Sequence, residues 1–130
     1  MNLESPKISI AKSAQDVFDF LANVENFEKL MPENISKFEV LDEDKFLFAL
    51  KGMPEIRLVL GDCTEYSKVV LGAASSKLSF TLEANISSLS DQVSEVQLEF
   101  KGDFNPMMAM MVKKPLTTFI ETLTENMSKL

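Results

Sequence analysis

The chain of 130 residues contains no histidine, no tryptophan and a single cysteine, Cys63. Without histidine, it lacks the side chain that most often acts as a general base or a metal ligand near neutral pH. One cysteine excludes an intrachain disulfide and any cysteine cluster for a metal, so we expect neither a metal nor another cofactor. The four glycines are far apart in the sequence and form no glycine-rich phosphate loop.

Positive charge is also scarce, because 13 basic residues face 20 acidic ones and the net charge is −7. This balance argues against a nucleic-acid partner and against electrostatic docking on an anionic membrane. No apolar stretch approaches the length of a membrane span, and the opening residues MNLESPKISI lack a positive leader followed by an apolar run. We therefore expect a cytoplasmic protein without stable membrane insertion.

The length corresponds to one domain, residues 1–130, and no linker or internal repeat divides it. The segment SPKISIAK alternates in polarity and predicts a first strand, with Pro6 near its edge. Two short helices are predicted next. The first is capped by Ser13, and the second runs roughly from Val24 to Leu30 and is ended by Pro32.

Alternation of apolar and polar residues then predicts about six antiparallel strands in direct succession, with a hairpin turn at residues 42–44 and a strand at 66–74 that is apolar on both faces. One face of this sheet is predicted to be covered by the rest of the protein and the other to be exposed to solvent. The covered face is predicted to carry Phe38, Val40, Phe46, Phe48, Leu50, Ile56, Leu58, Leu60, Leu78, Phe80, Leu82, Val96, Leu98 and Phe100.

The final segment predicts one long amphipathic helix, with Asn105 as the N-cap and Pro106 in the first helical position. At about 1.5 Å per residue it spans on the order of 35 Å, enough to cross a seven-stranded sheet. Pro115 lies inside this helix, where it removes one backbone hydrogen bond.

Four methionines, at positions 107, 108, 110 and 111, begin the predicted helix. Helical spacing places Met108 and Met111 on the same face as Val112 and Leu116. Methionine adapts its shape, so these side chains either fill gaps in the core or line the mouth of an adaptable cavity. Those that turn outward indicate a contact site, either a cavity entrance or a homodimer interface.

The order of one strand, two short helices, six strands and a long helix resembles the START-like, or SRPBCC, superfamily, which includes birch-pollen-allergen-type proteins, polyketide cyclases and lipid-transfer domains. The resemblance is carried by KISIAKSAQDVFDFLANVENFEKLMP and GDFNPMMAMMVKKPLTTFIETLTENM. It implies an α+β helix-grip fold in which a curved seven-stranded antiparallel sheet wraps around the C-terminal helix, with the two short helices between strands 1 and 2. It also implies an apolar cavity between sheet and helix, but it carries over no catalytic residue.

If the cavity exists, its predicted lining is apolar: Phe27, Phe46, Phe48, Leu58, Leu60, Phe80, Leu82, Leu98, Met108, Met111, Val112, Leu116 and Phe119. Two polar residues form an alternative pocket. Alternation turns Arg57 outward, toward a cross-strand ion pair with a glutamate, but facing inward it would bind a carboxylate or phosphate. Tyr66 is either an ordinary strand residue or a pocket hydroxyl.

Three functions remain open. The first is binding or transport of a small hydrophobic ligand, such as a lipid, a quinone or a polyketide-like compound. The second is a polyketide cyclase-like or aromatase-like enzyme acting on such a molecule, which requires a polar group in the cavity. The third is a protein-interaction module without a ligand, which requires a filled interior.

Overall fold

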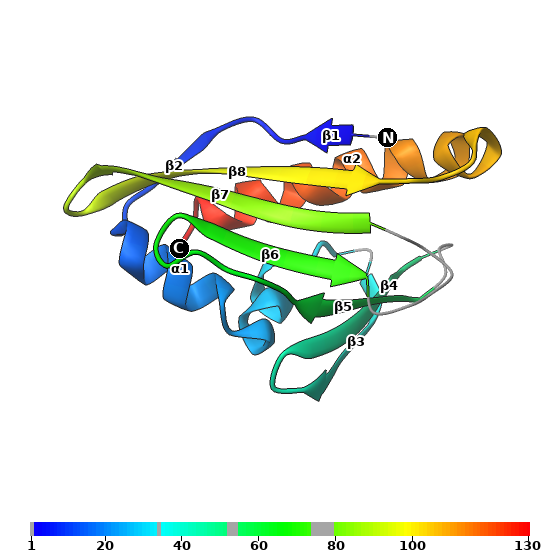
Figure 1. Cartoon of the computed structure of the whole chain (residues 1–130), viewed down its shortest axis with the longest axis horizontal. Helices are drawn as coiled ribbons and strands as arrows, with labels where there is room; N and C mark the ends of the chain where they lie inside the picture. The colour runs from blue at the N-terminus through cyan, green and yellow to red at the C-terminus, as the bar shows by residue number, and fades with distance from the viewer. Residues whose placement is uncertain (1, 34, 52–54, 74–79) are drawn as a thin grey trace.

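The computed structural model describes residues 2–33, 35–51, 55–73 and 80–130, so the prediction for Leu78 lies outside the described residues. Within these ranges the elements follow the predicted order (Figure 1). They are β1 (Asn2–Glu4), β2 (Ile8–Ile10), α1 (Ala14–Leu21), the 3-10 helix η1 (Val24–Leu30), β3 (Ile35–Asp42), β4 (Lys45–Leu50), β5 (Ile56–Leu60), β6 (Lys68–Ala73), β7 (Phe80–Ser90), β8 (Val93–Gly102) and α2 (Pro106–Met127).

The strands form one antiparallel sheet in the order β1-β8-β7-β6-β5-β4-β3, and β2 also pairs with β8. The predicted first strand contains β2, whereas β1 precedes the predicted segment. Both strands pair with β8 and share one position, which gives seven positions across the sheet. Pro6 lies between them and has no N–H to continue the pairing. Ser5 replaces that pairing locally, because its N–H donates to the Leu98 carbonyl at 2.9 Å and its hydroxyl accepts from the Leu98 N–H at 2.9 Å.

The edge strand β3 is less covered than the sequence predicts. Phe38 is half-buried and stacks against Phe46 of β4 with ring centroids 5.4 Å apart. Val40, which was expected on the covered face, is 39% exposed. Among the described strands, β3 pairs only with β4 and forms an edge of the sheet, so alternation alone overestimates its burial.

Polar side chains cap the two short helices, and the sequence predicts the first of these caps, Ser13. The Ser13 hydroxyl accepts a hydrogen bond from the Asp16 N–H at 3.1 Å and begins α1. The Asn23 side chain then accepts from the Glu25 N–H at 3.2 Å and begins η1. Each helix turns its apolar residues inward; the buried ones are Val17, Phe18, Leu21, Val24, Phe27 and Leu30.

The long helix α2 lies along one face of the sheet, and its first turns extend past the end of β8 (Figure 1). The Asn105 side chain caps it by accepting from the Met108 N–H at 2.8 Å. The helix continues through Pro115, which cannot donate to the Met111 carbonyl one turn earlier. Its buried residues all follow that proline: Leu116, Phe119, Ile120, Leu123, Thr124 and Met127.

Candidate ligand-binding cavity

A cavity of about 40 Å³ lies between the sheet and α2. The sheet provides one wall, α2 provides the other, and the loop between β8 and α2 closes one end. Every lining residue is apolar: Phe48, Ile56, Leu58, Phe80, Leu82, Phe100, Phe104, Met108, Val112, Leu116, Phe119 and Ile120.

Stacked phenylalanine rings form two sides of this cavity. Phe48 of β4 and Phe119 of α2 stack with centroids 4.8 Å apart, which joins the sheet to the helix. Phe80 and Phe100 stack at 5.0 Å, and Phe104 extends that stack at 6.1 Å from Phe100. Such ring pairs contribute about 0.5–1.5 kcal/mol each beyond the area they bury. The cavity is therefore bounded by fixed aromatic surfaces on its sheet side.

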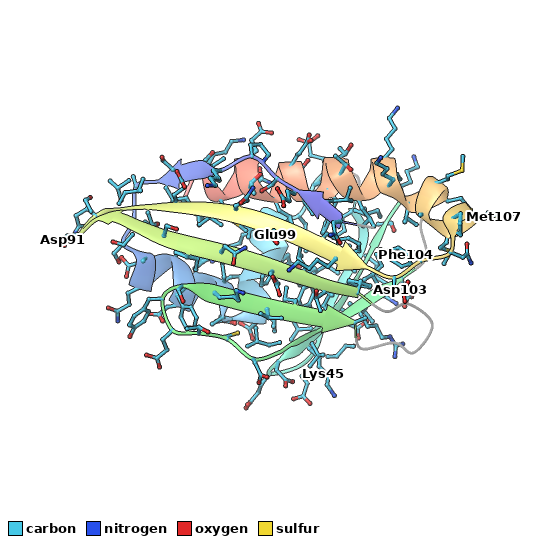
Figure 2. All side chains as sticks on the ribbon, turned by 45° about the horizontal axis from the view of Figure 1, so that its top comes forward. Lys45, Asp91, Glu99, Asp103, Phe104 and Met107 are labelled. Carbon is cyan, nitrogen blue, oxygen red and sulfur yellow. The ribbon has the colours of Figure 1, made fainter. Side chains whose placement is uncertain are left out.

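Gly102 allows Phe104 to fold back over the end of the cavity. A Cβ atom at Gly102 would lie 2.5 Å from Cε2 of Phe104 and 3.1 Å from Cε1 of Phe100. Only a glycine leaves room for both rings, so Phe104 depends on the residue two positions before it. Phe104 lies near Met107 at the end of the molecule where α2 begins (Figure 2).

A second, smaller cavity of about 10 Å³ continues the interior toward η1. Its lining consists of Phe27, Val69, Leu71, Leu82, Ala84, Leu98, Leu123 and Met127. A space of this size holds about one water at most. Leu82 borders both cavities, so side chains fill the interior on the η1 side of Leu82.

The walls of the larger cavity differ in exposure. All its lining residues on the sheet are buried, as are the three from the later turns of α2. Phe104, Met108 and Val112 are only half-buried. The cavity is therefore nearest to solvent where α2 begins.

Most of the predicted lining residues border one of the two cavities. The larger one includes Phe48, Leu58, Phe80, Leu82, Met108, Val112, Leu116 and Phe119, and the smaller one includes Phe27 and Leu98. Phe46 is fully buried but stacks against Phe27 at 5.2 Å and borders neither cavity. Leu60 is half-buried against the core and also borders neither.

Met111 is placed outside the cavity, with 68% of its surface exposed, so its predicted inward orientation is wrong. The inward stripe of α2 runs through Met108, Val112 and Leu116 at spacings of four. Met111 instead lies four residues after Met107 and shares that outward face. The segment is helical as predicted, but the face of α2 that turns inward is narrower than the predicted one and leaves out Met111.

The cavity also includes residues that the predicted lining omits. Ile56 and Phe100 are expected from the sequence on the covered face of the sheet, and Ile120 belongs to the inward stripe of α2. Phe104 was not anticipated. An aromatic residue directly before the N-cap commonly packs back on its helix, and that signal identifies it in retrospect.

Neither polar candidate lies at the cavity. Arg57 is exposed between two inward residues of β5, and it has no ion pair with any residue that the structure describes. Glu55 instead pairs with Lys37, whose Nζ lies 3.2 Å from the carboxylate. Tyr66 is 42% exposed in the turn before β6, at φ 66°, and its ring packs edge-on against Phe18. The strand predicted from residue 66 begins only at Lys68.

Charge is confined to other surfaces of the described chain. Lys101 lies in β8 within 3.4 Å of Glu83 and 3.6 Å of Glu99, and these carboxylates raise its pKa above the ordinary value, Glu83 contributing most. No ionisable side chain lines either cavity within the described ranges. The described residues also include no group of three or more His, Cys, Asp or Glu side chains that could hold a metal ion. None of the described helices is long and apolar enough to cross a membrane.

No protein-family model and no curated protein matches this sequence. Solved structures do match. A START superfamily protein from Mycobacterium smegmatis aligns with a TM-score of 0.71 at 12% identity, over 98% of this chain and 94% of that one. Norcoclaurine synthase from Thalictrum flavum, in complex with dopamine and hydroxybenzaldehyde, aligns with a TM-score of 0.73 at 10% identity, over 99% and 84%.

A protein from Thermus thermophilus aligns with a TM-score of 0.74 at 9% identity, over 99% of this chain and 95% of that one. At these identities the likeness concerns the fold. The alignments cover the whole fold of this chain, which is the antiparallel sheet, the two short helices after the first strand position and the long C-terminal helix. The chain therefore has the START-like helix-grip fold that its element order predicts.

Proposed function

We propose that the protein binds a small, uncharged, ring-containing hydrophobic molecule in the cavity between the sheet and α2. The observation that carries this proposal is the lining, in which every residue is apolar and five are phenylalanines. An apolar wall without a charged group offers nothing to hold a carboxylate or a phosphate. Stacked rings favour a flat molecule, such as a quinone or a polyketide-like compound, over a lipid acyl chain.

The size of the cavity sets a condition on this function. Pockets that enclose drug-sized ligands measure about 300–1,000 Å³. The space of about 40 Å³ is several times smaller, so a ligand enters only if part of the wall moves outward. The sheet side is held by strand pairing and buried rings. The movable part is the half-buried side formed by Phe104, Met108 and Val112.

The construction of α2 allows that movement. Residues 106–115 contain no buried side chain, whereas the turns after Pro115 are anchored in the core. Pro115 also deprives the Met111 carbonyl of its helical hydrogen bond, so the two parts of the helix are coupled less tightly at this point. An unbranched methionine at position 108 can then refit around a ligand by changing rotamers.

The enzyme alternative has weaker support. The structure of norcoclaurine synthase holds two small aromatic compounds, which agrees with a ring-containing ligand in this fold. However, catalysis of that kind needs an acid or base at the ligand, and none lines the cavity among the described residues. The small volume instead favours, as a second candidate, an interaction module that binds no ligand.

Titration with the uncharged dye N-phenyl-1-naphthylamine separates ligand binding from an interaction module that binds no ligand. We expect saturable fluorescence enhancement with the unmodified protein. Leu116→Trp fills the cavity, because Leu116 is 4% exposed and lines it, and should weaken dye binding about tenfold or more. Leu89→Trp makes the same change at a side chain that is 55% exposed and should leave binding unaltered.

Circular dichroism tests whether both variants remain folded. Equal dye binding by a folded Leu116→Trp variant contradicts the proposal. Absence of saturable binding by the unmodified protein supports the interaction module instead.

A further inference from the structure

The first turns of α2 present an exposed apolar surface that the cavity does not use. Met107, Met110 and Met111 are 75%, 83% and 68% exposed, the highest values among the large hydrophobic side chains that the structure describes. Their spacings of three and four residues place them on one helical face. Met107 lies at the extreme end of the molecule (Figure 2). We use the name methionine surface for these three residues together with Lys113 and Lys114.

This surface is locally positive on a protein that is acidic as a whole. Lys113 and Lys114 are exposed, and neither has an ion pair with a described residue. They follow Met110 by three and four residues and therefore adjoin the methionines. Asp103 is the only acidic residue between positions 102 and 120. The N-terminus of α2 adds partial positive charge.

We propose that the methionine surface docks the protein on the surface of an anionic lipid bilayer. Apolar side chains rimmed by lysines suit the boundary between acyl chains and anionic head groups. Each lysine near such a surface strengthens binding about fivefold. A bilayer accepts a small projecting apolar end, and the first turns of α2 project beyond the sheet (Figure 1).

A second copy of the chain fits this surface less well. A stable interface buries about 800 Å² on each partner and uses about 20–30 residues from each. The methionine surface has five residues. In a two-fold symmetric dimer it would also bring the lysines of one copy close to those of the other. Both the size and the charge of the surface therefore favour lipid.

The net charge of −7 led us to expect no docking on an anionic membrane. The repulsion at the methionine surface, however, depends on how far the acidic residues lie from it. At about 0.1 M salt the Debye length is about 10 Å. Glu121, the first acidic residue of α2 beyond the lysines, lies seven residues after Lys114, or roughly 10 Å along the helix axis, and Glu125 lies roughly 16 Å away. Salt therefore weakens the repulsion between these acids and a bilayer that contacts the methionine surface.

Docking would also bring the cavity to the source of its ligand. Met108 and Val112 line the cavity from the same turns that carry the exposed methionines. Apolar ring compounds concentrate in bilayers, so a docked molecule would present the movable wall to them. This consequence rests on the proposed function, whereas the docking itself does not.

The absence of tryptophan provides a sensitive reporter. Met110→Trp introduces the only indole, and its emission should shift to the blue when vesicles of phosphatidylcholine and phosphatidylserine are added. Sedimentation of the unmodified protein with the same vesicles then gives a partition coefficient. We expect binding that weakens at high salt and in the absence of phosphatidylserine.

Three sets of substitutions test the chemistry of docking. Changing Met107, Met110 and Met111 together to glutamine should lower partitioning about tenfold or more. The matched change of all three to leucine keeps the apolar surface and should partition like the unmodified protein. Lys113→Gln with Lys114→Gln should lower partitioning about 25-fold on phosphatidylserine vesicles and leave phosphatidylcholine vesicles unaffected.

Three outcomes overturn the proposal. They are no vesicle binding by the unmodified protein, undiminished binding by the glutamine variant, and lost binding by the leucine variant, which would indicate a contact specific to the thioethers. A dimer in gel filtration that the glutamine substitutions dissociate would assign the surface to a second copy. Leu116→Trp separates the two proposals, because it should weaken dye binding about tenfold or more and still bind vesicles.

Discussion

The two ends of α2 differ in how firmly they are packed against the rest of the protein. After Pro115 the helix is anchored, with buried residues from Leu116 to Met127 and an Asn126 side chain that donates to the Leu30 carbonyl of η1 at 2.8 Å. Before Pro115 none of its side chains is buried. The interior follows the same division, with about 10 Å³ of space at the anchored end and about 40 Å³ at the other. Stability is concentrated at one end, which leaves the other free to change.

The largest expected effect is a difference in stability between two alanine substitutions, one at each end of α2. Leu123→Ala removes a side chain that is completely buried and should destabilise the protein by about 2–5 kcal/mol. Met108→Ala shortens a half-buried side chain beside an existing cavity and should cost about 1 kcal/mol or less. Urea unfolding followed by circular dichroism measures both. Equal losses would contradict the division between the two ends.

A substitution at Pro115, where the two parts of α2 meet, should raise the stability of the protein and slow the entry of dye. Pro115→Ala restores an N–H that can donate to the Met111 carbonyl, and alanine is about 3 kcal/mol more favourable than proline inside a helix. We expect stabilisation by up to about that amount, together with slower uptake of the naphthylamine dye. Stopped-flow fluorescence measures the rate of uptake. If the variant becomes more stable and takes up dye as fast as before, Pro115 is not the hinge.

The smallest expected effect concerns the end wall of the cavity. Gly102→Ala places a Cβ 2.5 Å from the Phe104 ring, so the ring must shift outward. We expect a loss of about 1 kcal/mol of stability and tighter dye binding, because the cavity widens. Gly72→Ala is the matched control, since its Cβ would meet no atom within 4 Å. Dye binding that is identical in the two variants would show that Phe104 does not limit the cavity.

The sequence predicted the fold well because the fold depends on periodicity. Alternation located the inner face of β4, β5, β7 and β8, and the caps at Ser13 and Asn105 located two helix starts. Turn geometry was harder to predict. Tyr66 occupies a left-handed turn conformation that side-chain polarity does not reveal, so β6 was predicted to begin too early.

The candidate site was predicted less completely, because it depends on the ends of elements. Periodicity indicates which face of α2 turns inward but not where the sheet beneath it stops. Met111 and Phe104 both lie near that boundary. Met111 was predicted to face inward and is exposed, and Phe104 lines the cavity without having been predicted. The volume of the cavity depends on how the side chains interlock, and no pattern in the sequence gives that quantity.

Residue-resolved hydrogen exchange along α2, with and without the naphthylamine dye, tests the division most directly. We expect the amides of residues 110–114 to exchange much faster than those of residues 119–127, and dye binding to slow only the first group. Equal exchange in the two groups, unchanged by the dye, would contradict this division.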